Sequence, residues 1–212
     1  MRCLSNNNIS NPTEVTPQTL NLKRLRIALR QLAEGVYTLH KAGKLHRDIK
    51  PSNVLVTAQG RVVILDFGLV TELHTDPNIH ASFGFLGTPT HMSPEQSACM
   101  PVSEASDWYS VGVILYQALT GKLPFVGKME QIISQRLEFE PPTPSSLVVN
   151  IPFDLDELCV SLLRREPENR PNGKDVINRL RGVTSELPAS SLALALSSSQ
   201  TPSSTSTLVG RE

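Results

Sequence analysis

One segment of the chain would be apolar around nearly its whole circumference if it formed a helix. Residues 104–120 carry apolar side chains on almost all sides, namely Val111, Val113, Ile114, Leu115, Tyr116 and Leu119. Such a helix has no polar face to turn towards water, so it belongs in the centre of a core. The longest apolar stretch, around 111–116, is far shorter than the ~20 residues of a membrane span. The segment therefore predicts a globular, helical core and no membrane crossing.

Amphipathic patterns flank this segment on both sides. Apolar residues recur at steps of three and four at Leu22, Leu25, Leu29, Leu32, Ala33, Val36 and Leu39. They predict a long helix that ends at Gly43. Shorter helical patterns follow at 129–137, 155–163 and 175–180. Two β-like runs, 53–57 and 61–65, are joined by Ala58-Gln59-Gly60 and predict a hairpin.

The stretch 66–95 shows no sustained periodicity. An irregular stretch of that length inside a compact domain is usually functional or disordered. The predicted fold class is therefore a mainly α domain that displays one small β-hairpin between its helices.

The two ends of the chain differ in composition from the middle. Residues 1–20 are rich in Asn and Pro without an apolar period, which favours a flexible lead-in. Of the 18 residues from 190 to 207, 11 are Ser or Thr. Such a segment cannot bury enough apolar surface to offset its ordering entropy. We expect disordered tails around one folded domain at 21–183, with a Ser/Thr-rich linker over 184–212.

Charge and cysteine content exclude several classes of function. Lys plus Arg and Asp plus Glu both number 20, so the formal net charge is zero. Nucleic acids and anionic membranes are bound through a basic excess, and we expect neither as a partner. The scattered Cys3, Cys99 and Cys159 form no C-x-x-C pair, which argues against a disulfide framework and a structural zinc site. Without a visible secretory signal, the expected location is cytoplasmic.

The residues with chemical potential stand in three short motifs. They are His46-Arg47-Asp48-Ile49-Lys50-Pro51-Ser52-Asn53, Asp66-Phe67-Gly68 and Ser93-Pro94-Glu95. Asp66 closes the second strand of the hairpin, which can return its carboxylate to Asn53. One carboxylate, one amide oxygen and the ammonium of Lys50 suit Mg²⁺ with phosphate oxygens. Asp48 then serves as a proton acceptor, although a metal-dependent hydrolase could use the same carboxylates.

In this order and spacing, the motifs resemble those of the C-terminal lobe of a Ser/Thr protein kinase, over roughly residues 21–183. The resemblance implies ATP and Mg²⁺ as cofactors and a protein hydroxyl as acceptor. It assigns Asp48 as the catalytic base and Lys50 as the cation that neutralises the transferred phosphoryl group. Asn53 and Asp66 correspond to the two Mg²⁺ ligands. A capping or turn aspartate is the alternative for Asp66.

The resemblance also gives roles to neighbouring residues. Leu55 would lie beneath the adenine ring, or else be an ordinary core residue of the strand. Arg47 would hold a phosphorylated activation segment, or else be a solvated arginine. His46 and Phe67 would belong to a stacked apolar column. The alternative for His46, a buried core histidine with its hydrogen bonds satisfied, amounts to the same role.

Further assignments concern the segment after the hairpin, 66–95, which resembles an activation segment and substrate-docking loop. Thr75 and Ser82 are candidate phosphorylation sites, or merely exposed hydroxyls. Thr88, in Gly87-Thr88-Pro89, would hydrogen-bond to Asp48 and Lys50. The chain has His91 where the family commonly has tyrosine.

Three more residues have predicted structural roles. Glu95 and Arg170 resemble the ion pair that anchors the end of the activation segment. Asp107 resembles the buried helix aspartate that ties down the backbone of the catalytic loop.

Some parts of a kinase have no counterpart in this sequence. No G-x-G-x-x-G motif and no strand lysine precede the catalytic loop. The resemblance thus implies a missing N-terminal lobe and a 212-residue chain that is inactive or nearly so by itself. The final Leu208-Val209-Gly210-Arg211-Glu212 resembles the start of a regulatory ATPase module of bacterial-type kinases, or is a tail without meaning. The alternative function is a non-catalytic kinase-like binding or scaffold module.

Overall fold

The computed structural model describes residues 20–66, 71–72 and 89–182. Its elements are α1 (Leu22–Lys41), β1 (Lys44–Leu45), η2 (Pro51–Asn53), β2 (Val54–Val56), β3 (Val62–Ile64), β4 (Thr71–Glu72), α3 (Pro94–Ser97), α4 (Glu104–Thr120), α5 (Met129–Glu138), α6 (Pro144–Leu147), α7 (Phe153–Leu162), η3 (Pro167–Asn169) and α8 (Gly173–Gly182). The prediction of a mainly α fold with a small hairpin is confirmed. The expected linker and all but one residue of the expected lead-in lie outside the described residues.

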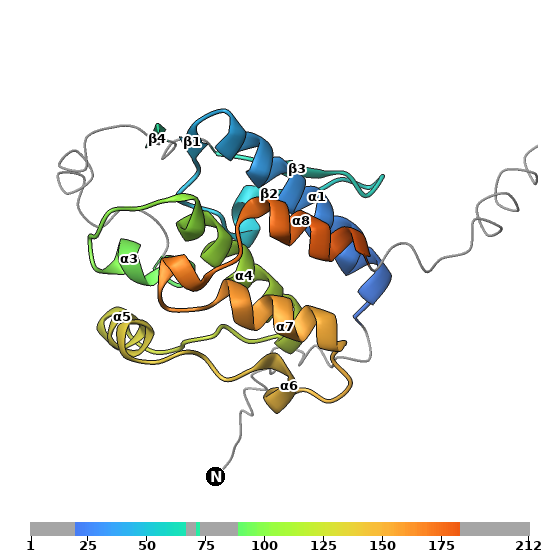
Figure 1. Cartoon of the computed structure of the whole chain (residues 1–212). Helices are drawn as coiled ribbons and strands as arrows, with labels where there is room; N and C mark the ends of the chain where they lie inside the picture. Colours follow the sequence, from blue (N-terminus) through green and yellow to red (C-terminus); the bar gives the residue numbers. More distant parts are fainter. Residues whose placement is uncertain (1–19, 67–70, 73–88, 183–212) are drawn as a thin grey trace, which may run out of the picture.

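Helix α4 occupies the middle of the core, as its apolar pattern predicts (Figure 1). Trp108, Val111 and Leu115 on this helix are completely buried. At Gly112 the backbone of α4 comes so close to α7 that an added Cβ would lie 2.8 Å from the Cβ of Leu162. The missing side chain is therefore what allows the two helices to pack at this distance.

Helix α1 has clear local signals at both ends. The side chain of Asn21 accepts a hydrogen bond from the backbone N–H of Arg24 at 3.0 Å and caps the first turn. After Lys41 the chain turns through Gly43, whose φ of +72° is a left-handed value that glycine adopts without strain. Helix α8 packs along α1 on the side next to α7 (Figure 1).

The predicted hairpin is the antiparallel pair β2–β3, in which Val54 pairs with Ile64 and Val56 with Val62. The side chain of Gln31 on α1 fixes the hairpin at two points. Its Nε2 donates to the carbonyl of Gly60 at 2.9 Å, and its Oε1 accepts from the N–H of Val62 at 3.1 Å. The hairpin is thus attached to the outside of α1 rather than buried in the core.

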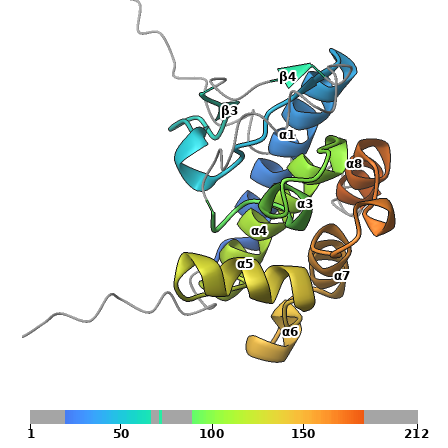
Figure 2. The same cartoon turned by 90° about the vertical axis from the view of Figure 1, so that its left-hand side faces the viewer.

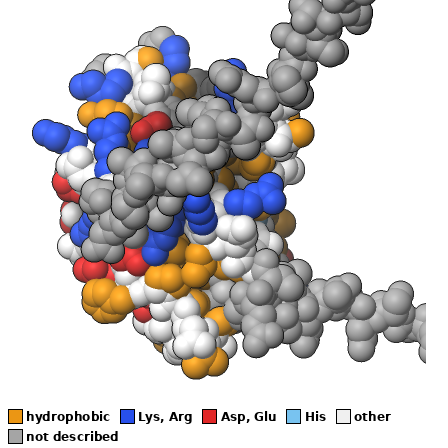
Figure 3. Space-filling view, turned by 90° about the vertical axis from the view of Figure 1, so that its right-hand side faces the viewer, with side chains coloured by type: hydrophobic (Ala, Val, Ile, Leu, Met, Phe, Trp, Pro, Cys, Tyr) orange, Lys and Arg blue, Asp and Glu red, His pale blue; other side chains and the backbone are white. Residues whose placement is uncertain are grey.

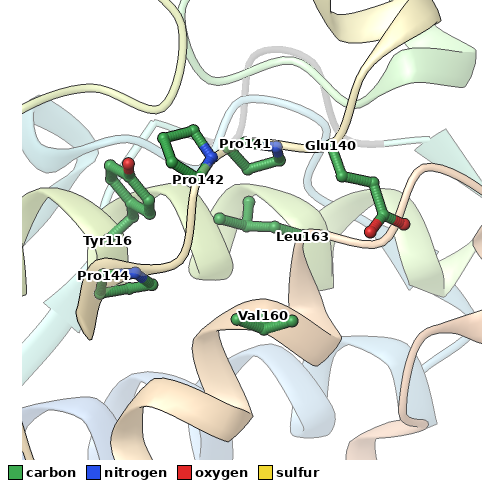
Figure 4. A pocket seen from close by; sticks show the side chains of 7 residues that line it. All are labelled: Tyr116, Glu140, Pro141, Pro142, Pro144, Val160 and Leu163. Atoms are coloured by element: carbon green, nitrogen blue, oxygen red, sulfur yellow. The ribbon is translucent and has the colours of Figure 1, made fainter. Parts of the chain in front are cut away.

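The helices α5 and α6 lie at the opposite end of the molecule from the hairpin (Figures 1 and 2). Between α5 and α6, Pro141 and Pro142 lie across Tyr116 and Leu163 (Figure 4). The cavity that these side chains enclose has a volume of only about 10 Å³. That is room for about one water molecule, so this particular cavity is too small for a ligand.

The structure corrects the sequence prediction in several places. Helices α5, α7 and α8 are one to four residues longer than their patterns predicted, because capping turns carry no apolar signal. The prediction of an irregular stretch over 66–95 is wrong at β4, which pairs with β1, and at α3. Helices α3 and α6 have four residues each, too few to show a period. Among the described residues, no helix combines the length and apolar character required to cross a bilayer.

The short helix α3 is held to the rest of the lobe by a buried ion pair. Glu95 accepts hydrogen bonds from Arg170 Nη1 and Nη2, at 2.8 and 2.9 Å, and from Ser106 Oγ at 2.7 Å. The remaining N–H groups of Arg170 donate to three backbone carbonyls, those of Arg164, Ala105 and Arg165. All five guanidinium donors are therefore satisfied. Burial alone would raise the pKa of Glu95, but the hydrogen bonds and charge of Arg170 outweigh it and hold that pKa below its ordinary value.

Replacing one partner of this ion pair is expected to destabilise the fold. Glu95→Gln leaves the Arg170 guanidinium buried without a counter-charge, which costs about 3–5 kcal/mol. Urea denaturation monitored by circular dichroism measures this loss. The matched control is Glu140→Gln, because the Arg164–Glu140 pair is close to half exposed on both sides and contributes less than about 1 kcal/mol. Equal midpoints for the two variants would contradict a structural role for the Glu95–Arg170 pair.

Candidate active site

The catalytic-loop residues are positioned by one buried carboxylate on α4. Asp107 Oδ2 accepts a hydrogen bond from the backbone N–H of His46, and Oδ1 accepts one from the N–H of Arg47, each at 2.8 Å. Asp107 Oδ2 also lies 2.8 Å from His40 Nε2 on α1, and since a carboxylate accepts, this ring nitrogen donates. Asp107 therefore ties the loop backbone to two helices, which is the geometry that its predicted role requires.

Arg47 has an unusual backbone conformation for its residue type. Its φ of +68° lies in the left-handed region, which costs a non-glycine residue roughly 1–2 kcal/mol. Besides the bond to Asp107, the backbone is held by the side-chain amide of Gln96 on α3, whose Nε2 donates to the carbonyl of Arg47 at 2.9 Å. Burial lowers the pKa of the Arg47 guanidinium, which Asp107 partly offsets. Within the described residues its Nε has no hydrogen-bond partner.

His46 connects the catalytic loop to the hairpin. Its side chain is completely buried. The backbone N–H of Asp48 donates to His46 Nδ1 at 3.3 Å, which makes Nε2 the protonated nitrogen, and Nε2 donates to the carbonyl of Leu65 at 3.1 Å. Both ring nitrogens are thus satisfied. Phe67, the other member of the expected column, lies outside the described residues.

The side chains of Asp48, Lys50 and Asn53 converge on one oxygen atom. Lys50 Nζ lies 2.7 Å from Asp48 Oδ2, and Asn53 Nδ2 donates to the same oxygen at 3.1 Å. Asn53 Nδ2 also donates to the backbone carbonyl of Asp48 at 2.9 Å. This fixes the amide of Asn53, so that Oδ1 is its oxygen donor for any bound cation. The carboxylate, the ammonium and the amide therefore form one compact cluster.

Asp66 follows the hairpin directly beside this cluster. The N–H of Leu65 donates to the carbonyl of Asn53 at 2.8 Å, which extends the β2–β3 ladder by one position and brings the chain at Asp66 next to Asn53. Asp66 itself has a left-handed φ of +61°. Local strain of this kind is frequent at functional sites and persists where the surrounding structure fixes it.

The donor set of Asn53 and Asp66 fits Mg²⁺. Magnesium is typically held by one or two carboxylates together with phosphate oxygens and water. The amide oxygen of Asn53, just before β2, and the carboxylate of Asp66, just after β3, are donors of the kind that this requirement names. No group of three or more His, Cys, Asp or Glu side chains suited to a metal ion occurs in the part of the chain that the structure describes. The residues therefore fit a metal that a phosphate ligand helps to hold, and not a closed all-protein site.

The structure bears on one of the two alternatives for Leu55 and leaves its contact with adenine a prediction. Its side chain on β2 is 49% exposed, so the alternative of an ordinary core residue is wrong. Val56 and Leu65 on the same hairpin are similarly exposed, at 50% and 40%. Three other predicted residues, Thr75, Ser82 and Thr88, lie outside the described residues.

A buried polar cluster lies under the start of α3 and was not predicted. Arg136 on α5 is 2% exposed; its Nη1 donates to Ser97 Oγ at 2.9 Å, and it also hydrogen-bonds to Tyr109. Burial lowers the pKa of this guanidinium. Nearby His91 is buried as well, and its carbonyl accepts from Ser110 Oγ at 2.8 Å. Burial, with a contribution from the charge of Arg136, lowers the pKa of His91 to about 4.

Sequence reasoning missed Arg136, His40 and Gln96. His40 stands four residues after Val36 on the buried face of α1, and a polar residue in that apolar period is the signal that could have found it. Gln96 occupies the third position after Ser93 in a capping box, which is also visible in the sequence. Nothing in the pattern of 129–137 distinguishes Arg136 from a surface arginine.

Comparison with known proteins gives consistent matches. The protein kinase domain family matches residues 3–180. Serine/threonine-protein kinase PknL of Mycobacterium tuberculosis is 38% identical over 143 residues, which are 67% of this chain and 36% of the relative. PknB of Mycobacterium leprae is 35% identical over 132 residues, 62% of this chain and 21% of the relative.

A third relative covers more of the chain. PknA of Corynebacterium glutamicum is 32% identical over 188 residues, 86% of this chain and 39% of the relative. The chain thus spans less than two fifths of the length of each of these three relatives. The family match covers most of the chain, and the relatives are Ser/Thr kinases. The chain belongs to the Ser/Thr protein kinase family.

Proposed function

We propose that this chain carries the catalytic-loop lobe of a Ser/Thr protein kinase, which transfers the γ-phosphoryl group of ATP to a protein Ser or Thr hydroxyl with the help of Mg²⁺. The observation that carries the proposal is the cluster in which Lys50 Nζ and Asn53 Nδ2 both approach Asp48 Oδ2. It brings a proton acceptor, a cation and an oxygen donor to one point. Cytoplasmic signalling is the corresponding cellular setting.

Each side chain has a distinct task in this mechanism. Asp48 orients the acceptor hydroxyl and accepts its proton, while Lys50 offsets the negative charge of the phosphoryl group in transit. Asn53 Oδ1 and the carboxylate of Asp66 would hold Mg²⁺, which would supply charge neutralisation at the phosphate oxygens. Leu55, half exposed on β2, offers an apolar surface for the adenine ring.

The segment between Asp66 and Glu95 selects the protein substrate in this proposal. In it, Thr88 would hydrogen-bond to Asp48 and Lys50, and Arg47 would receive a phosphate on Thr75 or Ser82. The Glu95–Arg170 ion pair fixes the end of that segment. A regulatory ATPase module behind the linker is part of the same proposal for the whole protein.

A second candidate function is a non-catalytic kinase-like module that binds a partner through its open cleft. The exposed side chains of Leu55, Val56 and Leu65 favour it, because apolar groups gathered on one hairpin mark interaction surfaces. The intact Asp48–Lys50–Asn53 cluster favours the enzyme, since binding alone does not require it.

Replacing Asp48 tests the catalytic assignment. In a single-turnover assay with Mg·ATP and a generic acceptor protein, the 212-residue chain should transfer phosphate to Ser and Thr more slowly than ~1 s⁻¹, the low end for kinases. The sequence contains no Gly-rich loop ahead of Asp48 to cover the phosphates. Asp48→Asn should reduce the rate a further ~10²–10⁴-fold. Exposed Glu130→Gln is the matched control, and equal rates for both variants would contradict the role of Asp48.

Metal binding can be measured independently of turnover. Mn²⁺ added in place of Mg²⁺ should broaden the amide NMR signals of Asn53, Leu65 and Asp66 in the presence of ATP, because a paramagnetic ion would lie beside them. Asp66→Asn removes the carboxylate assigned to the metal and should weaken this effect at least about tenfold. Exposed Glu168→Gln should leave it unchanged. Broadening that survives in Asp66→Asn would show that the cation binds elsewhere.

His91 should make stability depend on pH between about 4 and 6.5. In the folded protein the pKa of His91 is about 4, whereas in the unfolded chain it is near 6.5. As the pH falls below 6.5, the imidazole is therefore protonated in the unfolded chain before it is protonated in the folded protein. Stability should therefore be complete above pH 6.5 and be lost towards pH 4, by at most about 1.4 kcal/mol per pH unit. His91→Gln should flatten this dependence in urea titrations, and identical pH profiles for both proteins would refute the assignment.

A further inference from the structure

A large hollow formed by described residues lies away from the catalytic cluster. It has a volume of about 640 Å³ and runs between the first half of α1 and the turn of the β2–β3 hairpin. This is within the range of about 300–1,000 Å³ that is usual for ligand sites. Its lining is mostly apolar and includes Leu20, Leu25, Ile27, Ala28 and Val56. We call it the α1–hairpin groove.

Apolar side chains of this groove are open to solvent and have basic neighbours. Ile27 is 41% exposed and Val56 50% exposed. Arg24 is the one charged side chain among the described lining residues, and Lys23 is exposed next to it on α1. Hydrophobic side chains also lie among Lys and Arg side chains on the face that Figure 3 shows. An apolar groove with a basic border fits a segment that is apolar and uncharged or acidic.

We propose that residues 192–196 of the same chain dock in the α1–hairpin groove. The sequence there is Leu192-Ala193-Leu194-Ala195-Leu196, the longest apolar run after α8. In an extended segment alternate side chains point to the same side, so the three leucines would enter the groove together. The small alanines between them keep the other side of the segment narrow.

The segment is attached at a suitable distance. Helix α8 ends at Gly182, and just before it Arg181 Nη2 lies 3.5 Å from Glu34 Oε1 on α1. The nine residues 183–191 can span up to roughly 30 Å when extended. A helix with its side chains is only about 10–12 Å wide. The connection is therefore long enough to pass around α1 from the α8 side to the groove.

Charge and sequence pattern favour this segment over two other possible occupants of the groove, a second copy of the chain and residues 1–19. The docking segment 192–196 is uncharged, and residues 184–210 contain no Lys or Arg that the basic border of the groove would repel. A second copy of the chain would bring Lys23 and Arg24 against an identical basic surface. Residues 1–19 contain few apolar side chains, at Met1, Cys3, Leu4, Ile9 and Val15, and no alternating run as long as 192–196.

Because the segment is tethered to the lobe, even a weak contact is enough to keep it docked for a large part of the time. A short apolar peptide that binds with a Kd near 1 mM would be about half bound when a flexible linker supplies an effective concentration in the millimolar range. The docked and released states would thus have similar populations, which a partner of the linker can shift. The hairpin that borders the groove carries Asn53 and Asp66 at its other end. The docking itself does not depend on the proposed kinase function. Any effect of docking on metal binding by Asn53 and Asp66 does depend on it.

The test is methyl NMR of the full 212-residue chain. Nuclear Overhauser effects should connect the methyl groups of Leu192, Leu194 and Leu196 with those of Ile27 and Val56. Replacing the three leucines by serine should remove these effects and shift the Ile27 and Val56 signals. The matched control, Ala193→Ser with Ala195→Ser, should retain both. Ile27→Asp tests the groove side and should move the leucine signals to the positions of a free peptide, whereas Met129→Asp on exposed α5 should not.

Three other outcomes would overturn the proposal. Effects that disappear on tenfold dilution would identify a second copy as the occupant. Contacts of Ile27 and Val56 with residues 1–19 would identify that segment instead. If Ile27 and Val56 show no contact outside the lobe and their signals are unchanged in the triple variant, the groove has no occupant from this chain.

Discussion

The site depends first on the buried carboxylate of Asp107. A charged group without contact to water is tolerated only when it is fully hydrogen-bonded, and this carboxylate accepts from two backbone N–H groups and from His40. The same bonds hold Arg47 in a left-handed conformation that it would not adopt in isolation. The most central helix of the core therefore dictates the path of the loop that carries Asp48.

The hairpin is positioned by contacts from two directions. His46 and Asn53 connect its open end to the catalytic loop, while Gln31 fixes its turn on α1. Its strands are only three residues long, and an isolated hairpin of that size is not stable in water. Its geometry is consequently a property of the loop and of α1, and this is what holds the two residues proposed as metal ligands, Asn53 and Asp66, at its open end.

The sequence was sufficient for the parts of the fold that have a period. The central helix has its predicted bounds, and α1 and the hairpin deviate by at most two residues, because each repeats an apolar pattern over enough positions to be recognised. The cluster of Asp48, Lys50 and Asn53 could also be predicted from the sequence, since these residues lie within one short motif. Arg136 was not, because its burial depends on Ser97 and Tyr109, which are distant in sequence. The same holds for the pairing of β1 with β4, which no local pattern encodes.

Stability and chemistry are carried by different side chains in this lobe. Asp107, Glu95 and Arg170 are buried, and each holds a segment of the backbone in place. The side chains of Asp48 and Lys50 keep 10% and 22% of their surface exposed and contact each other across the cluster. Removing one member of the first group would leave a buried partner unpaired and destabilise the fold, whereas the second group remains accessible to an acceptor hydroxyl and to phosphate. Substitutions at Asp48 therefore test the proposed chemistry, while those at Asp107 test the fold that positions the catalytic loop.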